Sequence, residues 1–482
     1  MEQISIFDGA NTLRIDKPIR LVELFGGYGS QALALKYLGI PFEHHALSEW
    51  AVKSIQAYKD MHSPDDDSDY SETLSTDEIR GWLLGRISSD YSTPMTEKQI
   101  ERLTDAAVRK IYNNMMATKN LGSIMAINGP DLNITETDKY CYIMTYSFPC
   151  QDLSSAGKGM GMARGSGTRS GLLWEVERLL KEMDELPQIL LMENVPEVIR
   201  AKNMPHFAEW VSFLDSLGYK TKTQILNTKH FGVPQNRERC FAVSFLGDYY
   251  YDAPQGFPLK YKLKDVLETN VDESYYLKDA TLNYFISHSE EMKDKGNGFR
   301  FEPIHIMNCK QAGILVGGKW DKMMDVSRHV YSTETIAPTL HTCGGGNLEA
   351  KIMEEPLQEN HRVRKLTEKE CFRCQGVRDD DFERVKQNQS KSSLYHLAGD
   401  SITTSVLMAL FGEMLGIDWR GKVDDLAEDL SKERNIKNDT HRIAKNSRRA
   451  HCSRKRQEPY TRRKKARGRN LADNLILGKA DD

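Results

Sequence analysis

The sequence of 482 residues lacks an apolar run long enough to cross a bilayer, the features of a secretory signal and a dense set of cysteines. Its most apolar late segment, SVLMALFGEMLGI, is short and includes a glutamate, whereas a membrane-spanning helix needs about 20 predominantly apolar residues. The first residues, MEQISIFDGANT, contain neither a basic region nor an apolar core, so we expect no secretory signal. Eight cysteines scattered along this length do not make a disulfide framework. We therefore expect a protein of a reducing cytoplasm that makes no contact with a membrane.

The formal net charge of −3 is small, but the charge is unevenly distributed. Residues 442–482 hold 14 Lys and Arg against 4 Asp and Glu, which leaves the rest of the chain acidic. A basic segment of this kind suits a phosphate backbone, because each neutralised phosphate releases a counterion. It is equally compatible with a solvated, disordered tail that has no specific partner. Both interpretations stay open, and the bulk charge does not by itself argue for nucleic acid.

Apolar runs and helical stretches alternate along the first half of the chain, which predicts an α/β fold. Residues 18–58 are typical of a strand, a glycine turn, a helix and a second strand. Further strands are predicted at 140–144, 189–192, 223–226 and 240–245. Residues 96–116 predict one helix, begun by a capping box of Thr96 and Gln99. The alternation favours a mainly parallel sheet with helices on both faces.

Changes in composition divide the chain into segments. Residues 1–246 are expected to form a catalytic and cofactor-binding domain, interrupted at about 60–128 by a helical insertion. Residues 247–361 are rich in Tyr, Lys and Gly and lack a helical period, which predicts a smaller, irregular domain. Residues 362–417 return to a helical pattern and complete the first domain, and residues 418–482 form a charged, largely basic tail.

A glycine turn follows the first predicted strand in LVELFGGYGSQALAL. Gly27, Gly29 and Ala32 fit the pattern G-x-G-x-x-A, in which the first glycine permits a tight turn and the second lets a ligand approach the backbone. Glu49, about twenty residues further on, suits the hydroxyls of a ribose, and Trp50 suits an adenine face. A cofactor with a nucleoside is therefore favoured over a purely structural turn. A dinucleotide and S-adenosylmethionine both stay open, because backbone amides can hold a pyrophosphate.

Reactive side chains lie next to three of the predicted strands. Cys150 follows the strand at 140–144 in SFPCQDLSSAGKG, and Glu193 ends the apolar segment PQILLMENV. Arg237 and Arg239 precede another strand in GVPQNRERCF. Ligands bind outside the carboxyl ends of the strands in open α/β sheets. Each residue alone has a structural explanation, but their joint placement favours a presented nucleophile with polar neighbours.

These motifs, in this order, resemble those of the cytosine-C5 DNA methyltransferases across most of the chain. FGGYG, which includes Phe25, resembles the cofactor loop, and SEW resembles the motif with the ribose acid. SFPCQDLS resembles the nucleophile motif, and ENV and QNRER resemble the two base-contacting motifs. GPDLNIT is similar to the motif whose acid, here Asp131, contacts the adenine. RSGLLWE, with Leu172, resembles the segment after the catalytic loop. RKLTEKECFRCQGV resembles the motif between the domains, and GDSITTSVL, with Asp400, the segment that returns to the cofactor.

The resemblance implies a Rossmann-like sheet that binds S-adenosylmethionine and a target-recognition domain at 247–361, where TIAPTLHTCGGGN matches. It implies that a thiolate at Cys150 adds to C6 of a cytosine flipped out of double-stranded DNA, so that C5 can accept the methyl group. Glu193 would contact the ring N3 and the exocyclic amine. Arg237 or Arg239 would favour the thiolate, and one of them would bind the cytosine O2.

The glycine-rich loop after the nucleophile, with Lys158, Arg164 and Arg169, would close on a DNA backbone. We expect a monomer of the bacterial cytoplasm or nucleoid, of restriction-modification or phage type, from which any cognate restriction endonuclease acts separately. No metal is expected, because Cys371 and Cys374 lack a second cysteine pair.

Three alternatives stay open at this point. The related RNA cytosine-C5 methyltransferases share the PCQ and ENV chemistry, and a catalytically idle DNA-binding homologue or a NAD-dependent oxidoreductase would share the glycine turn. The sequence also departs from the family. Ser30 stands where a further glycine is usual, Tyr146-Ser147 where Gly-Gly is common, and Asp400 where Asn is common. The segment after SEW is longer than usual, which makes residues 60–128 an insertion of unknown purpose.

Overall fold

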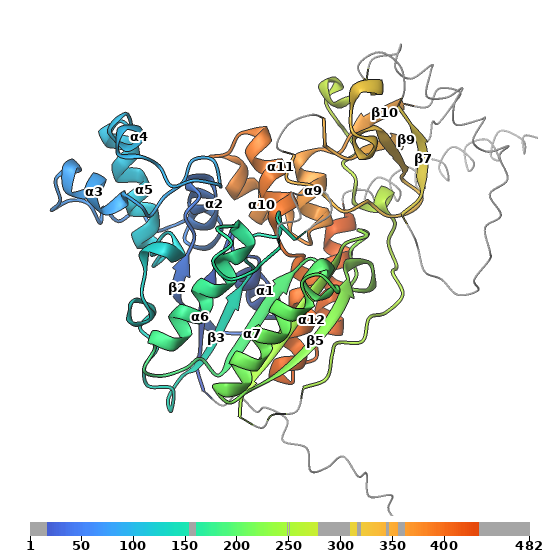
Figure 1. The fold of residues 1–482 in the computed structure, drawn as a ribbon. Helices are drawn as coiled ribbons and strands as arrows, with labels where there is room; N and C mark the ends of the chain where they lie inside the picture. Colours follow the sequence, from blue (N-terminus) through green and yellow to red (C-terminus); the bar gives the residue numbers. More distant parts are fainter. Residues whose placement is uncertain are drawn as a thin grey trace, which may run out of the picture. The chain divides into compact units, whose positions relative to one another are not determined.

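A mixed six-stranded sheet lies at the centre of the computed structural model, which describes residues 17–153, 161–247, 249, 251–277, 309–315, 320–343, 347–354 and 362–432 (Figure 1). In spatial order its strands are β2 (Phe42–Ser48), β1 (Ile19–Leu24), β3 (Cys141–Tyr146), β4 (Ile189–Asn194), β6 (Glu238–Leu246) and β5 (Tyr219–Asn227). The predicted α/β class is confirmed. None of the helices in the described ranges is long and apolar enough to span a membrane.

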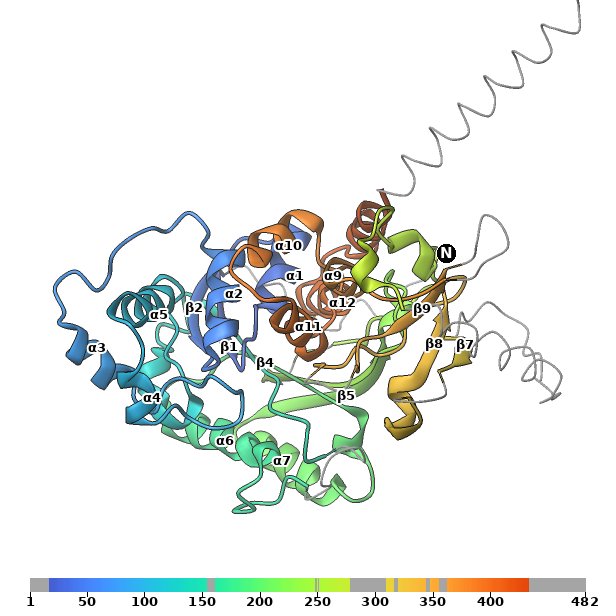
Figure 2. The same cartoon turned by 90° about the horizontal axis from the view of Figure 1, so that it is seen from above.

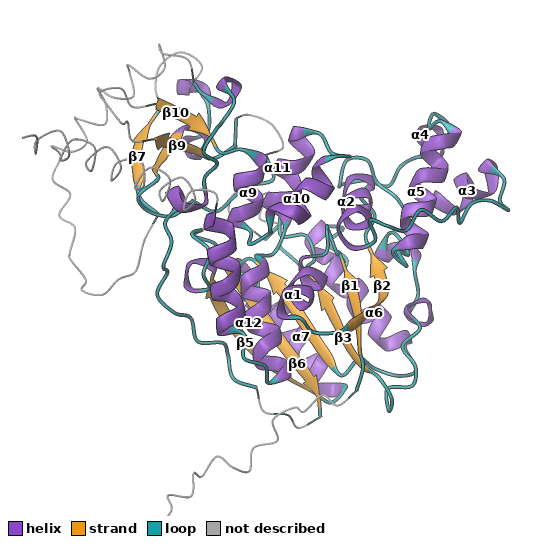
Figure 3. Ribbon diagram, turned by 180° about the vertical axis from the view of Figure 1, so that it is seen from behind, coloured by secondary structure: helices purple, strands orange, loops and turns teal. Residues whose placement is uncertain are grey.

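Helices cover both faces of the sheet, as Figure 2 shows from above. They are α1 (Ser30–Leu38) and α12 (Thr404–Leu415) on one face (Figure 3), and α6 (Leu173–Glu182) and α7 (Met204–Ser216) on the other (Figure 1). Successive side chains of a strand point to opposite sides. Leu21 therefore packs in the core beneath α1 and α12, and Val22 in the core beneath α6 and α7. Burial on both faces explains why the central strands β1, β3 and β4 are largely apolar runs in the sequence.

One strand, β6, runs against the direction of the others. β1, β2, β3 and β4 are mutually parallel, whereas β6 is antiparallel to both of its neighbours, β4 and β5. The amino-terminal end of β6 thus lies at the edge where the neighbouring strands have their carboxyl ends. Cys240 pairs with Asn194 at the end of β4, so Arg239 reaches this edge. Ligands bind at the carboxyl ends of the strands, and residues that precede a strand reach that edge only when the strand runs in the opposite direction. Because β6 is reversed, the arginines that precede it lie at the predicted edge.

The insertion forms a helical layer beside α2 (Val52–His62), with α3 (Thr76–Leu83), α4 (Glu97–Glu101) and α5 (Asp105–Ala117) around a small core of their own. The prediction of one helix over 96–116 is wrong. The capping box of Thr96 and Gln99 begins α4, but that helix ends at Glu101. Thr104 then caps α5 by accepting the amide of Ala107 at 3.2 Å, because threonine before an acidic residue is itself a helix start.

The described residues from 309 onward add a second sheet, the helices α9 to α12 and a further helical segment. The sheet has the order β10 (Arg362–Lys365), β9 (Lys351–Glu354), β8 (His329–Ser332) and β7 (Gln311–Ile314). The helices are α9 (Glu368–Cys374), α10 (Asp379–Lys386), α11 (Lys391–Asp400) and α12. Residues 420–432, at the start of the expected tail, are helical, and Val423 and Leu426 are buried in the large core. The body of the fold thus continues to at least residue 432, and the basic residues 442–482 lie outside the described ranges.

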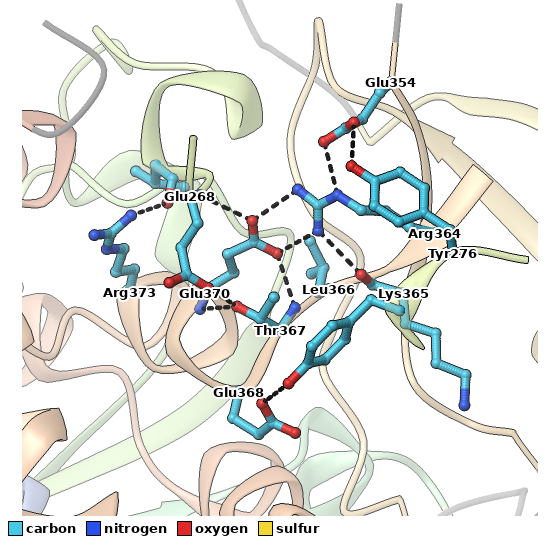
Figure 4. A network of polar contacts seen from close by, with 12 residues as sticks. Glu268, Tyr276, Glu354, Arg364, Lys365, Leu366, Thr367, Glu368, Glu370 and Arg373 are labelled. Carbon is cyan, nitrogen blue, oxygen red and sulfur yellow. Dashed lines mark hydrogen bonds and ion pairs between the residues drawn. The ribbon is translucent and has the colours of Figure 1, made fainter. Parts of the chain in front are cut away.

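A buried ion pair joins the second sheet to the helices that follow it (Figure 4). Arg364 of β10 makes two bonds of 2.7 Å to the carboxylate of Glu370 in α9, and both side chains are fully buried. Glu354 of β9 accepts a further bond from Arg364 at 2.7 Å. Glu370 also accepts the amides of Thr367 at 2.8 Å and Glu268 at 2.9 Å. A buried charge pair is tolerated only when its polar atoms are satisfied in this way, so the pair fixes β10 against α9.

Removing one partner of this pair should destabilise the protein strongly. We expect Glu370→Ala to lower the free energy of unfolding by about 3–5 kcal/mol, because the guanidinium of Arg364 stays buried without its main partner. The double variant Arg364→Met, Glu370→Leu should recover part of that loss. The measurement is the urea dependence of unfolding.

The matched control is the exposed pair of Arg362 and Glu273, whose side chains are 46% and 77% exposed. Glu273→Ala should cost less than about 1 kcal/mol, because solvent screens such pairs. Equal losses in Glu370→Ala and Glu273→Ala would show that the buried pair does not hold the junction.

Candidate active site

The strands β3 and β4 end side by side, and the residues that follow them form the centre of the site. Tyr146 pairs with Met192 in parallel register at the last paired position. Ser147 and Cys150 follow directly after β3, and Glu193 lies at the end of β4. The pairing of two neighbouring strands therefore brings the predicted nucleophile and the predicted carboxylate to the same edge.

Two side chains hold the backbone just before Cys150. The amide Nδ2 of Asn194 donates to the carbonyl oxygen of Phe148 at 2.9 Å. The hydroxyl of Ser170 donates to the carbonyl oxygen of Pro149 at 2.7 Å. The position of Cys150 is thus set by β4 on one side and by the start of α6 on the other.

Glu193 is 6% exposed, and each of its carboxylate oxygens has a partner. Arg239 Nε lies 3.0 Å from Oε1, and the hydroxyl of Ser147 donates to Oε2. The carboxylate plane is therefore fixed before any ligand binds. Ser147 is one of the positions where the sequence departs from the family pattern, and the structure gives that departure a role in orienting Glu193.

The thiol of Cys150 is half-buried, and its environment disfavours the thiolate. Burial raises the pKa of Cys150 above its ordinary value. Arg239 lowers the pKa, while the carboxylates of Asp400 and Glu193 raise it and Arg237 lowers it again. Each arginine does lower the pKa of the thiol, as expected. The pKa is nevertheless raised overall, because burial and the two carboxylates outweigh the two arginines.

The two arginines have different roles, which the sequence could not separate. Arg239 is paired with Glu193 beside the thiol. Arg237 is 3% exposed and donates to the carbonyl oxygens of Leu340 at 3.2 Å, Gly399 at 3.1 Å and Ser401 at 2.8 Å. Burial, with the nearby charge of Arg239, lowers its pKa to about 9. Arg237 therefore ties segments together, and Arg239 is the arginine that contacts Glu193.

Gln235 is a further residue of this edge that the sequence analysis did not single out. It is fully buried, donates to the carbonyl oxygen of Cys374 at 2.6 Å and accepts the amide of Leu340 at 3.1 Å. The adjacent amide of Asn236 donates to Ala337 at 2.8 Å. The sequence did contain a signal for Gln235, since this residue begins the motif QNRER. Its neighbour in space, Ala337, lies within the second motif, TIAPTLHTCGGGN. These two motifs lie side by side.

The glycine turn and Glu49 form the second half of the site. Phe25 and Gly27 have φ values of 60° and 57°, and a Cβ at Gly27 would meet nothing within 4 Å, so the space over this residue is open. The carboxylate of Glu49 accepts the amides of Gly27 at 2.8 Å and Ala51 at 2.7 Å. Burial raises the pKa of Glu49 to about 7, and Asp400 adds to this effect. A carboxylate that is fixed by backbone amides beside an open glycine turn fits a ribose hydroxyl.

Gly29 does not serve the purpose that the sequence pattern assigned to it. Its φ is 82°, and a Cβ there would lie 2.3 Å from His62 and 2.6 Å from Tyr58. The glycine makes room for these two side chains of α2 rather than for a ligand. Tyr58 in turn donates to Glu23, which lies beneath the turn, and burial raises the pKa of Glu23 to about 7. Glu23 is thus a buried support of the turn.

Asp131 is not brought to this edge. It is exposed and accepts the amide of Asn128 at 2.7 Å as part of a capping box next to Glu182, where α6 ends. The segment beside the end of β2 begins at Asn120. This residue is buried, and it accepts the amide of Glu49 at 3.1 Å and donates to the carbonyl oxygen of Glu49 at 3.0 Å. A short polar motif in an inserted segment of unusual length was not enough to locate the position.

The remaining predicted residues flank the two halves. Leu172 is half-buried at the start of α6, and Trp50 is half-buried after Glu49. Asp400 is exposed at the end of α11 and acts electrostatically on both Glu49 and Cys150, so it lies between the two halves. Arg164 is paired with Glu177 and Glu209, and residues 154–160 of the glycine-rich loop lie outside the described ranges.

The comparisons with known proteins agree with this geometry. The family model of the C-5 cytosine-specific DNA methylases matches residues 95–416. The orphan methyltransferase M.SssI of Spiroplasma monobiae is 32% identical over 406 residues, which cover 83% of this chain and 98% of that protein. The type II methyltransferase M2.ScrFI of Lactococcus lactis subsp. cremoris is 31% identical over 402 residues, which cover 82% and 99%. The solved structure of the S. pombe Dnmt2 methyltransferase, at 16% identity and a TM-score of 0.52, covers 83% of this chain and 99% of its own and supports the fold.

Charge substitutions around the thiol should move its titration in opposite directions. In Asp400→Asn a negative charge near Cys150 is removed, so we expect the pKa of the thiol to fall and alkylation by iodoacetamide to begin at lower pH. In Arg239→Gln a positive charge is removed, so the pKa should rise. The measurement is the modification rate of the Cys150 peptide against pH, read by mass spectrometry on the DNA-free protein.

Asp325→Asn is the matched control, because Asp325 is exposed beside β8 and pairs with Arg328. Its pH profile should equal that of the wild type. Identical profiles for Asp400→Asn and Arg239→Gln would contradict the electrostatic description of the site.

Proposed function

This chain belongs to the C-5 cytosine-specific DNA methylases, and from that premise we propose that Cys150 attacks a cytosine flipped out of double-stranded DNA while S-adenosylmethionine donates the methyl group. The chain is a DNA cytosine-5-methyltransferase. The proposal concerns the attacking atom, the donor and the residues that act on the base.

The convergence of Cys150, Glu193 and Arg239 at one edge supports the proposal most directly. Asn194 holds the backbone before the thiol, and Ser147 and Arg239 hold the carboxylate. C5 of cytosine is too weak a nucleophile to take a methyl group unaided. A thiol, a carboxylate and a guanidinium around one space are the groups needed to activate the ring.

In the first step, the thiolate Sγ of Cys150 forms a bond to C6 of the cytosine. The electron pair of the C5–C6 double bond then becomes available at C5. Glu193 shares a proton with the ring N3 and receives a hydrogen bond from the exocyclic amine, which stabilises the charge that builds up in the ring. Of the two arginines, Arg239 is proposed to bind the cytosine O2, because it is paired with Glu193, whereas Arg237 bonds to backbone carbonyl groups.

S-adenosylmethionine, when bound, supplies an electrophilic methyl carbon, which C5 accepts as the bond from that carbon to the sulfonium breaks. A base then takes the C5 proton, the C5–C6 double bond forms again and the thiolate of Cys150 leaves. Dividing the reaction in this way replaces one difficult step by two easier ones.

The donor would lie over the glycine turn. Glu49 offers its carboxylate to ribose hydroxyls, and the open space at Gly27 admits the ligand. Asp400 is close enough to Glu49 and Cys150 to act on both electrostatically, and its carboxylate favours a cationic donor. Phe25, Trp50 and Leu172 are proposed as apolar walls.

The family match favours DNA over RNA as the substrate, and it rules out the NAD-dependent alternative. Named relatives include both an orphan methyltransferase and type II methyltransferases. We propose that this chain acts as a monomer in the bacterial cytoplasm, and that a cognate nuclease, where one exists, is a separate protein. The basic residues 442–482 are proposed to add non-specific affinity for the DNA backbone.

Two measurements test the attacking atom. Bisulfite sequencing of DNA from bacterial cells that express the protein identifies the methylated sequence. A duplex with 5-fluorocytosine at that site should then form a covalent complex that depends on S-adenosylmethionine and survives a denaturing gel, because fluorine cannot leave C5 as a proton does. Cys150→Ser should form no complex and lose methyl transfer by roughly a thousandfold or more.

Cys343→Ser provides the control, because Cys343 is also half-buried but lies in the segment after β8. It should trap the duplex as the wild type does. Methylation retained in Cys150→Ser, or a complex that Cys150→Ser still forms, would remove Cys150 from its role.

A further inference from the structure

The insertion contributes a turn, residues 88–93, that lies against the residues following β2. Ser88 donates its amide to the carbonyl oxygen of Trp50 at 2.7 Å and accepts the amide of Val52 at 2.9 Å. Trp50 and Val52 lie just after Glu49, the proposed ribose acid. The backbone of the turn is therefore paired with the segment that carries the proposed cofactor side of the site.

Asp90 makes this turn rigid. Its carboxylate accepts the amides of Ser92 and Thr93, each at 2.8 Å, and the hydroxyl of Thr93 at 2.9 Å. Those backbone hydrogen bonds lower the pKa of Asp90 to about 2. The turn therefore keeps one conformation at neutral pH, with Tyr91 at its tip.

Tyr91 is held in a conformation that a tyrosine rarely adopts, with a φ of 62°. Its ring stacks on His396 of α11, with 3.9 Å between the ring centroids and 28° between the planes. The hydroxyl of Tyr91 reaches the side chains of Ser54 in α2 and Ser393 in α11. A tyrosine in this strained conformation costs stability, and such strain gathers at functional sites.

The position of the ring relates it to the two carboxylates of the proposed cofactor site. Burial raises the pKa of Tyr91, and the charges of Glu49 and Asp400 raise it further, so both carboxylates lie within electrostatic reach of the phenol. Glu49 follows β2 and Asp400 ends α11. Tyr91 thus stands between the two elements that bound the space over the glycine turn.

The same turn also reaches the segment after the nucleophile. Arg169 donates to the hydroxyl of Ser92 at 2.9 Å, and the amide of Arg169 donates to Asp152 at 2.9 Å. Asp152 lies two residues after Cys150. The insertion is therefore connected to both halves of the site.

We propose that Tyr91 is a cofactor-binding residue, whose ring forms the wall of the S-adenosylmethionine site between Glu49 and Asp400. This inference rests on the proposed donor and adds to it the purpose of the insertion. An aromatic wall excludes water from the ribose side of the ligand, which strengthens the hydrogen bonds to Glu49. The insertion then supplies a part of the site that the glycine turn and β2 leave open.

The test is calorimetric titration of the full, DNA-free chain with S-adenosylmethionine and with S-adenosylhomocysteine. Tyr91→Ala should weaken binding of both by roughly tenfold, as expected for the loss of an aromatic contact. Tyr91→Phe keeps the ring that forms the proposed wall and removes only the hydroxyl, which is directed to Ser54 and Ser393 rather than to the ligand, so its affinity for both ligands should stay within about twofold. In steady-state assays Tyr91→Ala should raise KM for the donor while kcat changes little.

Tyr70→Ala is the matched control, because Tyr70 lies in the same insertion, is 42% exposed and donates its hydroxyl to Asp66 at 2.8 Å. Its affinity for both ligands should equal that of the wild type. Should Tyr91→Ala fail to fold, Tyr91→Leu replaces it, with the same loss of affinity expected and thermal unfolding of the ligand-free protein as the check on folding.

Other outcomes have distinct meanings. Unchanged ligand affinity in Tyr91→Ala, with a lowered melting temperature, would make the residue purely structural and overturn the inference. Unchanged ligand affinity with weakened DNA binding would overturn it as well and assign the turn to DNA through Arg169. A wild-type chain that binds neither ligand would overturn the proposed donor and this inference with it, whereas normal wild-type binding together with an unaffected Tyr91→Ala overturns the inference alone.

Discussion

The parallel pairing of β3 with β4 is the constraint on which the rest of the site depends. Tyr146 and Met192 are partners at the last paired position, so the residues that follow the two strands lie next to each other. Asn194 then holds the backbone before Cys150, and Ser147 holds Glu193, so each strand fixes the reactive group of the other. Core packing on both faces of the sheet keeps that register, since a slip by one residue would move every apolar side chain to the wrong side.

The electrostatics around the thiol follow from this crowding. A thiol that is half-buried beside two carboxylates is held protonated, and only Arg239 and Arg237 oppose that effect. A raised pKa lowers the fraction of thiolate, which is the form that alkylating agents and oxidants attack. In the proposed mechanism, a cytosine that engages Glu193 would reduce the influence of that carboxylate on the thiol. Formation of the thiolate at Cys150 would then be coupled to the presence of the correct base.

Much of the fold and of the reactive centre could be predicted, because both depend on local signals. Continuous apolar runs revealed the buried strands, and PCQ, ENV and QNRER end or begin those runs. Features that depend on tertiary contacts could not be predicted. Gly29 has the pattern of a ligand-facing glycine, yet its neighbours are side chains of α2. Asp131 matched a motif but caps a short helix elsewhere, and the separate roles of Arg237 and Arg239 depend on carbonyl groups that are distant in sequence.

The ion pair between β10 and α9 has a consequence for the exchange of segments between related chains. Arg364 and Glu370 both lie in the segment that returns to the large core, while Glu354, their additional partner, belongs to β9. The bonds between Arg364 and Glu370 do not involve β9, but Nε of Arg364 has its acceptor there. A replacement for the segment that carries β9 would therefore leave a buried N–H of Arg364 without a partner unless it supplied an acceptor at position 354. Chimaeras made within this segment should tolerate sequence change best when that acidic position is retained.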